Sequence, residues 1–210
     1  MSSRLSTILS AILVVACTGT SPQTQDTLDE ISAPGVVFGQ APAAAGGVPS
    51  VVMLSAESGR SDSGPVFDPE PVIDQFGLVF SPTILLVRVG QTVRFTNSES
   101  LAHNVNLRHV DTDLVVLNAD TDPTETAHYT FEESGGYDVT CNVHPGMTAF
   151  VFASPTPYAV VADLDGEFTL SGVPPGSYTL TVWSTDTALV SERAVEVGEG
   201  PTELEAGPAS

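Results

Sequence analysis

Short apolar runs separated by turn residues recur along most of the chain, which is the pattern of strands rather than helices. Residues 92–96 show it best, because Val93 and Phe95 fall on one face of an extended chain and polar residues fall on the other. The runs predicted as strands up to residue 153 are 36–38, 51–54, 72–75, 78–80, 84–89, 92–97, 103–108, 114–117, 126–131, 137–141 and 149–153.

The last third of the chain has the same character. Tyr178, Leu180 and Val182 alternate with threonines, which predicts another half-buried strand. Further strands are predicted at 158–162 and 167–170, with a weaker one at 194–197, and residues 199–210 are expected to be a frayed tail. No segment beyond the N-terminus has helical periodicity, so the fold class is all-β.

The N-terminus differs from the rest of the chain and is typical of an export signal. Residues 1–16 combine Arg4 with an apolar stretch too short to span a bilayer. Val14-Val15-Ala16-Cys17 resembles the lipobox of bacterial lipoproteins, which implies lipidation at Cys17 and a flexible tether over 17–33. By the same resemblance, the residue after the cysteine indicates the outer membrane. An ordinary signal peptide with an incidental cysteine is the alternative.

The strongly negative charge of the chain limits which partners it can bind. The chain carries a formal charge of −20, with 26 acidic residues and six basic residues that are all arginine. Such a chain does not bind nucleic acid phosphates, and it has no basic patch for an anionic membrane, so we expect membrane contact only through the lipid anchor. The charge favours a positively charged partner, although a salt-rich habitat would favour the same surface.

The candidate chemistry lies in the segment Cys141-Asn142-Val143-His144-Pro145-Gly146-Met147. Thiolate, imidazole and thioether are the donors that suit copper, and a His₂Cys plane with a distant axial methionine is the blue-copper arrangement. His103, 38 residues upstream of Cys141, is the predicted second imidazole. Zinc is disfavoured because thioether is a poor ligand for it. His109 lies beyond the strand that begins at His103, and His128 falls within a strand without a partner motif, so both are interpreted as ordinary side chains.

The Cys-x₂-His-x₂-Met spacing and the segment around His103 resemble cupredoxins, with the short ligand loop of the amicyanins. The resemblance covers residues 70–153 and implies a Greek-key β-sandwich that binds one copper, cycling between Cu(I) and Cu(II). It also implies that Asn104, which follows the first histidine, donates a hydrogen bond to the cysteine sulfur. An apolar docking patch formed by His144, Pro145, Gly146 and Phe150 is a further expectation from the family.

A second resemblance covers the chain after the copper loop. Asp163-Leu164-Asp165-Gly166 and the later Pro174-Pro175-Gly176 turn are similar to carboxypeptidase regulatory-like, transthyretin-type β-sandwiches. Residues 158–198 alone offer too few strands to close a sandwich. We therefore expect residues 34–57 to supply its first strands, with the cupredoxin inserted between the two parts. Two consecutive domains are the alternative.

The resulting prediction is a type 1 copper protein that carries single electrons at the periplasmic face or surface of a bacterial outer membrane. Its expected partner is a redox protein, such as a dehydrogenase or a cytochrome, and we expect the chain to be monomeric. A non-redox protein for copper storage or delivery and a structural β-sandwich scaffold are the alternatives. An enzyme is not expected, because multicopper oxidases and copper nitrite reductases need additional histidines and no His-x-His occurs.

Overall fold

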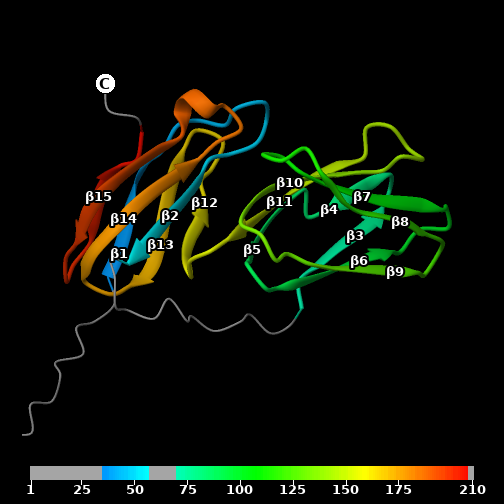
Figure 1. Ribbon diagram of the computed structural model, residues 1–210, viewed down its shortest axis with the longest axis horizontal. Helices are drawn as coiled ribbons and strands as arrows, with labels where there is room; N and C mark the ends of the chain where they lie inside the picture. Colours follow the sequence, from blue (N-terminus) through cyan, green and yellow to red (C-terminus); the bar gives the residue numbers. More distant parts are fainter. Residues whose placement is uncertain (1–34, 57–69, 208–210) are drawn as a thin grey trace, which may run out of the picture. The chain divides into compact units, whose positions relative to one another are not determined.

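The computed structural model describes residues 35–56 and 70–207. The export signal at 1–16, the lipidation site Cys17 and the tether at 17–33 lie outside the described residues. Within them, no helix is long and apolar enough to cross a membrane. The chain forms the elements β1 (Gly35–Gln40), β2 (Val51–Ala56), β3 (Val72–Phe76), β4 (Val79–Ser81), β5 (Ile84–Arg88), β6 (Thr92–Asn97), β7 (His103–His109), β8 (Val115–Thr121), β9 (Thr126–Thr130), β10 (Gly135–Thr140), β11 (Thr148–Ser154), β12 (Tyr158–Val161), β13 (Glu167–Val173), β14 (Gly176–Trp183), η1 (Thr187–Leu189), β15 (Ser191–Val197) and β16 (Thr202–Glu205) (Figure 1). The all-β prediction is confirmed.

Strands β3 to β11 make one β-sandwich. One sheet has the order β4-β3-β6-β9 and the other has the order β5-β11-β10-β7-β8. Alternate residues of β6 face the core, so Val93 and Phe95 are fully buried as their spacing predicts. The hydroxyl of buried Tyr137 donates a hydrogen bond to the Glu133 carbonyl at 2.8 Å, a tyrosine corner typical of Greek-key sandwiches.

A second sandwich is built from both ends of the described chain. Its sheets have the orders β13-β1-β16 and β12-β2-β14-β15. Strand β2 lies between β12 and β14, so the segments on either side of residues 70–153 share one sheet and one apolar core that includes Leu54 and Tyr178. Tyr178 forms a second tyrosine corner, because its hydroxyl donates a hydrogen bond to the Pro174 carbonyl at 2.7 Å, four residues upstream, as Tyr137 does to Glu133.

The expected frayed tail at 199–210 needs a correction. Residues Thr202–Glu205 form β16, which pairs in parallel with β1 through the register Val37↔Thr202 to Gln40↔Glu205. Strand β1 approaches β16 closely, since a Cβ placed on Gly39 would lie 1.8 Å from the Leu204 carbonyl oxygen. The segment Thr-Glu-Leu-Glu is too polar to predict as a strand by itself, and it becomes one because β1 offers a sheet edge.

The topology of the first sandwich determines where its loops meet. Strand β10 lies between β7 and β11 and is antiparallel to both. The beginning of β7, the end of β10 and the beginning of β11 therefore lie at the same end of three adjacent strands. The candidate ligands are found at these three positions.

Candidate metal centre

The turn between β10 and β11 carries three of the four predicted ligands. Cys141 follows the last residue of β10, and Met147 precedes the first residue of β11. The Cys141 amide donates to the Met147 carbonyl at 3.2 Å, and the Met147 amide donates to the His144 carbonyl at 3.3 Å. Gly146 has a φ of 97°, a left-handed conformation that favours glycine, so it permits this tight turn. The turn therefore brings the backbones of Cys141, His144 and Met147 close together.

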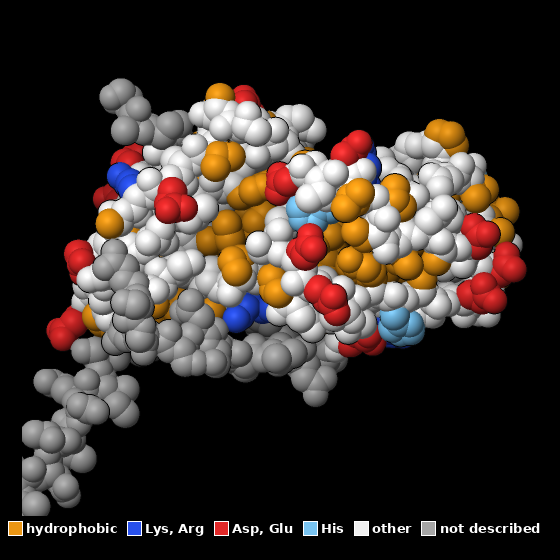
Figure 2. Space-filling model, in the orientation of Figure 1, with side chains coloured by type: hydrophobic (Ala, Val, Ile, Leu, Met, Phe, Trp, Pro, Cys, Tyr) orange, Lys and Arg blue, Asp and Glu red, His pale blue; other side chains and the backbone are white. Residues whose placement is uncertain are grey.

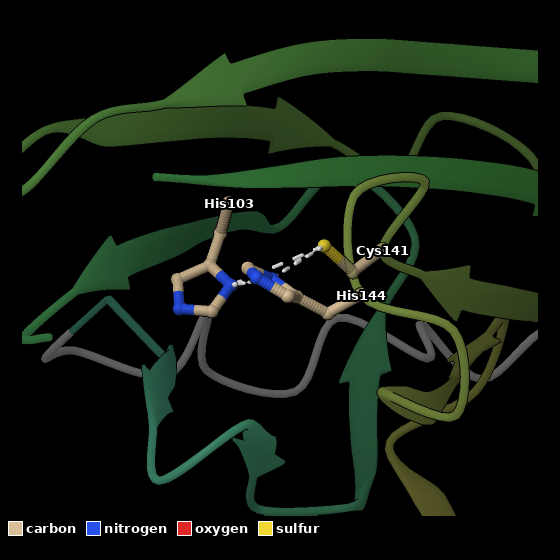
Figure 3. A group of neighbouring side chains, drawn as sticks. All are labelled: His103, Cys141 and His144. Carbon is tan, nitrogen blue, oxygen red and sulfur yellow. Dashed lines mark hydrogen bonds between the residues drawn. The ribbon is translucent and has the colours of Figure 1, made fainter. Parts of the chain in front are cut away.

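His103 approaches from the neighbouring strand, as the first residue of β7. Figure 3 shows its imidazole, the imidazole of His144 and the sulfur of Cys141 turned toward one another. The Cys141 Sγ lies 4.0 Å from Nδ1 of His103 and 4.0 Å from Nδ1 of His144, and the two Nδ1 atoms are 3.0 Å apart. Three of the four predicted donors are thus brought together.

The size of this triangle fits a metal ion. A point equidistant from the three atoms lies roughly 2.2 Å from each, which matches the bonds of about 2.0 to 2.3 Å that imidazole nitrogen and thiolate make to zinc, a neighbouring first-row metal. His103 and Cys141 are buried, while His144 is half-buried. A metal held there would be shielded from water on most sides and would reach the surface through the edge of His144.

The proton on His103 is fixed by a carboxylate. Nε2 of His103 lies 3.0 Å from Oε2 of Glu99, and a carboxylate can only accept a hydrogen bond. The neutral ring therefore carries its proton on Nε2 and presents the lone pair of Nδ1 to the centre, which is the tautomer that a metal ligand needs. The Glu99 pKa is lowered, first by the hydrogen bond from the Leu78 amide and then by His103.

Met147 completes the predicted donor set. Its side chain is buried in the same apolar cluster as Cys141, Val105 and Val139. A thioether in an apolar environment is a weak donor, which is the property of the axial position in a blue-copper site. The chemistry of the set, with one thiolate, two imidazole lone pairs and one nearby thioether, fits copper better than zinc.

The side chain of Asn104 is bonded to the neighbouring strand β8. Its side-chain NH₂ donates to Asn118 at 3.0 Å and to Asp120 at 2.9 Å, both on β8. These bonds use both protons of the side-chain amide, so the predicted hydrogen bond from Asn104 to the Cys141 sulfur would come from its backbone N–H and stays a prediction. Asn118 also accepts a hydrogen bond from Asn142 at 3.3 Å. It therefore links Asn104, which follows His103, to Asn142, which follows Cys141.

Three further residues discussed from the sequence, His109, His128 and Phe150, lie outside the group of candidate ligands. His109 is buried and packs edge-on against Tyr137, and His128 lies on the surface, so neither adjoins the centre. Phe150 cannot belong to an exposed docking patch, because its side chain is buried against Phe152 and Trp183. Sequence reasoning missed Glu99, for which the only signal was its position four residues before His103.

Comparisons with known proteins agree with this centre. Residues 70–153 match the family model of copper binding proteins of the plastocyanin/azurin family, and residues 154–204 match that of domain II of polysaccharide lyase family 4. No curated protein matches the chain. The family match to 70–153 and the donor set together identify copper as the metal of this centre, and the first sandwich is the part of the chain that matches this copper-binding family.

Several solved structures are similar to part of the chain. A purple cupredoxin from Nitrosopumilus maritimus is 28% identical, with 40% of this chain and 99% of that chain covered and a TM-score of 0.36. A reduced amicyanin variant is also 28% identical, with 49% and 98% covered and a TM-score of 0.38. An oxidised amicyanin variant is 27% identical, with 49% and 92% covered and a TM-score of 0.38.

Proposed function

We propose that this chain is a type 1 copper protein that carries single electrons. The observation that carries the proposal is the convergence of one sulfur and two Nδ1 atoms, with separations of 4.0, 4.0 and 3.0 Å, on a point within bonding distance of all three. His103, Cys141 and His144 would hold the metal, and the thioether of Met147 would be a further, weaker ligand. Copper bound there supplies a one-electron couple between Cu(I) and Cu(II).

The residues around the metal suit this chemistry because they are held in place before it binds. His103 belongs to β7, and the Cys141 turn is closed by backbone hydrogen bonds that join it to β11. Donors fixed by paired strands move little when the metal changes charge, so little reorganisation opposes electron transfer. The buried sulfur is also protected from solvent oxidants.

Electrons would leave through the half-buried ring of His144. Leu101, two residues before His103, and Val143, directly before His144, are exposed, with 44% and 51% of their surface accessible. We propose that they contribute to a docking surface for a redox protein, in place of the buried Phe150. The charge of −20 favours a basic partner, and Figure 2 shows carboxylates distributed over the visible face of the molecule. We propose a monomer, with contact made only for electron transfer.

Export and membrane attachment remain part of the proposal. The signal at 1–16 and lipidation at Cys17 would hold the protein at the periplasmic face or surface of an outer membrane, where it would meet its partner. The second sandwich would act as a non-catalytic module.

A redox and exchange experiment separates electron transfer from copper delivery. The copper-loaded protein is reduced with ascorbate, reoxidised with ferricyanide and cycled repeatedly, and the reduced form is challenged with a Cu(I) chelator. We expect full spectral recovery in every cycle and slow loss of copper to the chelator. Rapid transfer of Cu(I) to the chelator, without a reversible couple, would instead show a copper delivery protein.

A further inference from the structure

The loop that precedes His103 carries a carboxylate in contact with the buried ligand. Oε2 of Glu99 accepts hydrogen bonds from Nε2 of His103 at 3.0 Å and from the Leu78 amide at 3.2 Å. The imidazole of His103 is fully buried, and 18% of the Glu99 side chain is accessible. The negative charge is therefore located on the side of the ring opposite the metal-binding nitrogen.

Glu99 is itself held in place by its own loop. Its backbone amide donates to Oδ1 of Asn97 at 2.9 Å, and Nδ2 of Asn97 donates to the carbonyls of Leu101 and Thr121 at 2.7 and 2.8 Å. Asn97 is buried and terminates β6, so it fixes the loop that connects β6 to β7. The second bond, from the Leu78 amide in the turn between β3 and β4, restrains the carboxylate from another element.

From these contacts we propose that Glu99 is a positioning residue of the copper centre. It holds the His103 ring with Nδ1 toward the metal, and its charge favours the Cu(II) state over the Cu(I) state, so that the reduction potential is lower than a neutral residue would give. This inference rests on the proposed function. The physical basis is that an acceptor bonded to the outer nitrogen orients the ring and raises the basicity of the ligating nitrogen.

Two substitutions separate the hydrogen bond from the charge. Glu99→Gln keeps an oxygen acceptor of the same size and removes the charge, while Glu99→Ala removes both. Glu132→Gln is the matched control, because it removes one negative charge at the opposite end of the sheet. Strand β9 begins beside the end of β6, near Asn97, and Glu132 follows the other end of β9. Each full-length protein is loaded with copper, and its Cu(II) and Cu(I) affinities are measured by competition.

We expect Glu99→Ala to weaken Cu(II) binding by about 10- to 100-fold, the usual cost of losing such a supporting contact. Glu99→Gln should weaken Cu(II) binding less but should still reduce the preference for Cu(II) over Cu(I). Each tenfold loss of that preference raises the reduction potential by about 59 mV. The Cu(II) hyperfine splitting in electron paramagnetic resonance should change in Glu99→Ala and remain unchanged in Glu132→Gln.

The two proposals can fail separately. If the unsubstituted protein shows no reversible couple, electron transfer is wrong whatever Glu99 does. If it shows the couple and both Glu99 variants have the affinities and potential of Glu132→Gln, the role of Glu99 is overturned. Nitrogen-15 NMR of the metal-free protein adds a readout that needs no copper. We expect a protonated Nε2 at His103 that changes in Glu99→Ala, and an unchanged signal would also overturn the inference.

Discussion

The hydroxyl of Tyr137 offers a direct test of how the first sandwich is held together. It donates one hydrogen bond of 2.8 Å to the Glu133 carbonyl, while its ring packs edge-on against Phe131 and His109 with centroids 4.8 and 4.7 Å away. Tyr137→Phe removes the hydrogen bond and keeps the ring. Because this hydrogen bond is only partly buried, water can hydrate the freed Glu133 carbonyl in part, and we expect a loss of about 0.5 to 1.5 kcal/mol.

Thermal unfolding measures this loss. For a domain of this size, each kcal/mol lowers the melting temperature by about 4 to 8 °C. Near-ultraviolet circular dichroism follows the transition in the metal-free protein, and the visible band follows it in the copper-loaded protein. Tyr129→Phe is the control, because Tyr129 packs against the same Phe131 and its hydroxyl makes no hydrogen bond within the described residues. Equal melting temperatures for the two variants would refute the reasoning.

Three further outcomes are expected. Met147→Leu should retain copper and colour with a raised reduction potential, measured by spectroelectrochemistry, because Cu(II) loses a weak axial donor; an unchanged potential would remove Met147 from the site. Burial raises the pKa of Tyr137 to about 12, whereas unfolded tyrosine titrates near 10, so between about pH 10 and 12 only the unfolded state loses this proton and the folded state becomes less stable. Denaturant titrations should show this fall in stability, and a smaller fall in Tyr137→Phe. Gly39→Ala should destabilise the second sandwich by at least about 1 kcal/mol in denaturant titrations, because the added Cβ would collide with the Leu204 carbonyl. Gly200→Ala is the control and should leave the stability unchanged, because there is open space around Gly200.

The ligand loop could be recognised from the sequence because its chemistry is local. Cys141, His144 and Met147 lie within seven residues, and the turn that joins two adjacent antiparallel strands brings them together. His103 is distant in the sequence but begins the neighbouring strand, so the cupredoxin resemblance was needed to select it over His109 and His128. The structure brings it to the sulfur and leaves the other two elsewhere.

The remaining features depend on contacts that no local pattern records. Glu99 reaches His103 because Asn97 shapes a loop through three hydrogen bonds, and nothing in the order of residues 97–103 fixes that curvature. The side-chain amide of Asn104 bonds to two acceptors on β8, Asn118 and Asp120, and no local pattern in the sequence predicts that pairing. Strand β16 was missed because its pairing with β1 is parallel and joins segments more than 160 residues apart.

The most direct test of the account is a copper titration of the purified protein, followed by visible absorption and electron paramagnetic resonance, with Cys141→Ser alongside. We predict one copper per chain with an intense band from thiolate to Cu(II), and the loss of that band when oxygen replaces the sulfur. A colourless protein that holds copper only weakly, or a variant that keeps the band, would contradict a copper centre built on His103, Cys141 and His144.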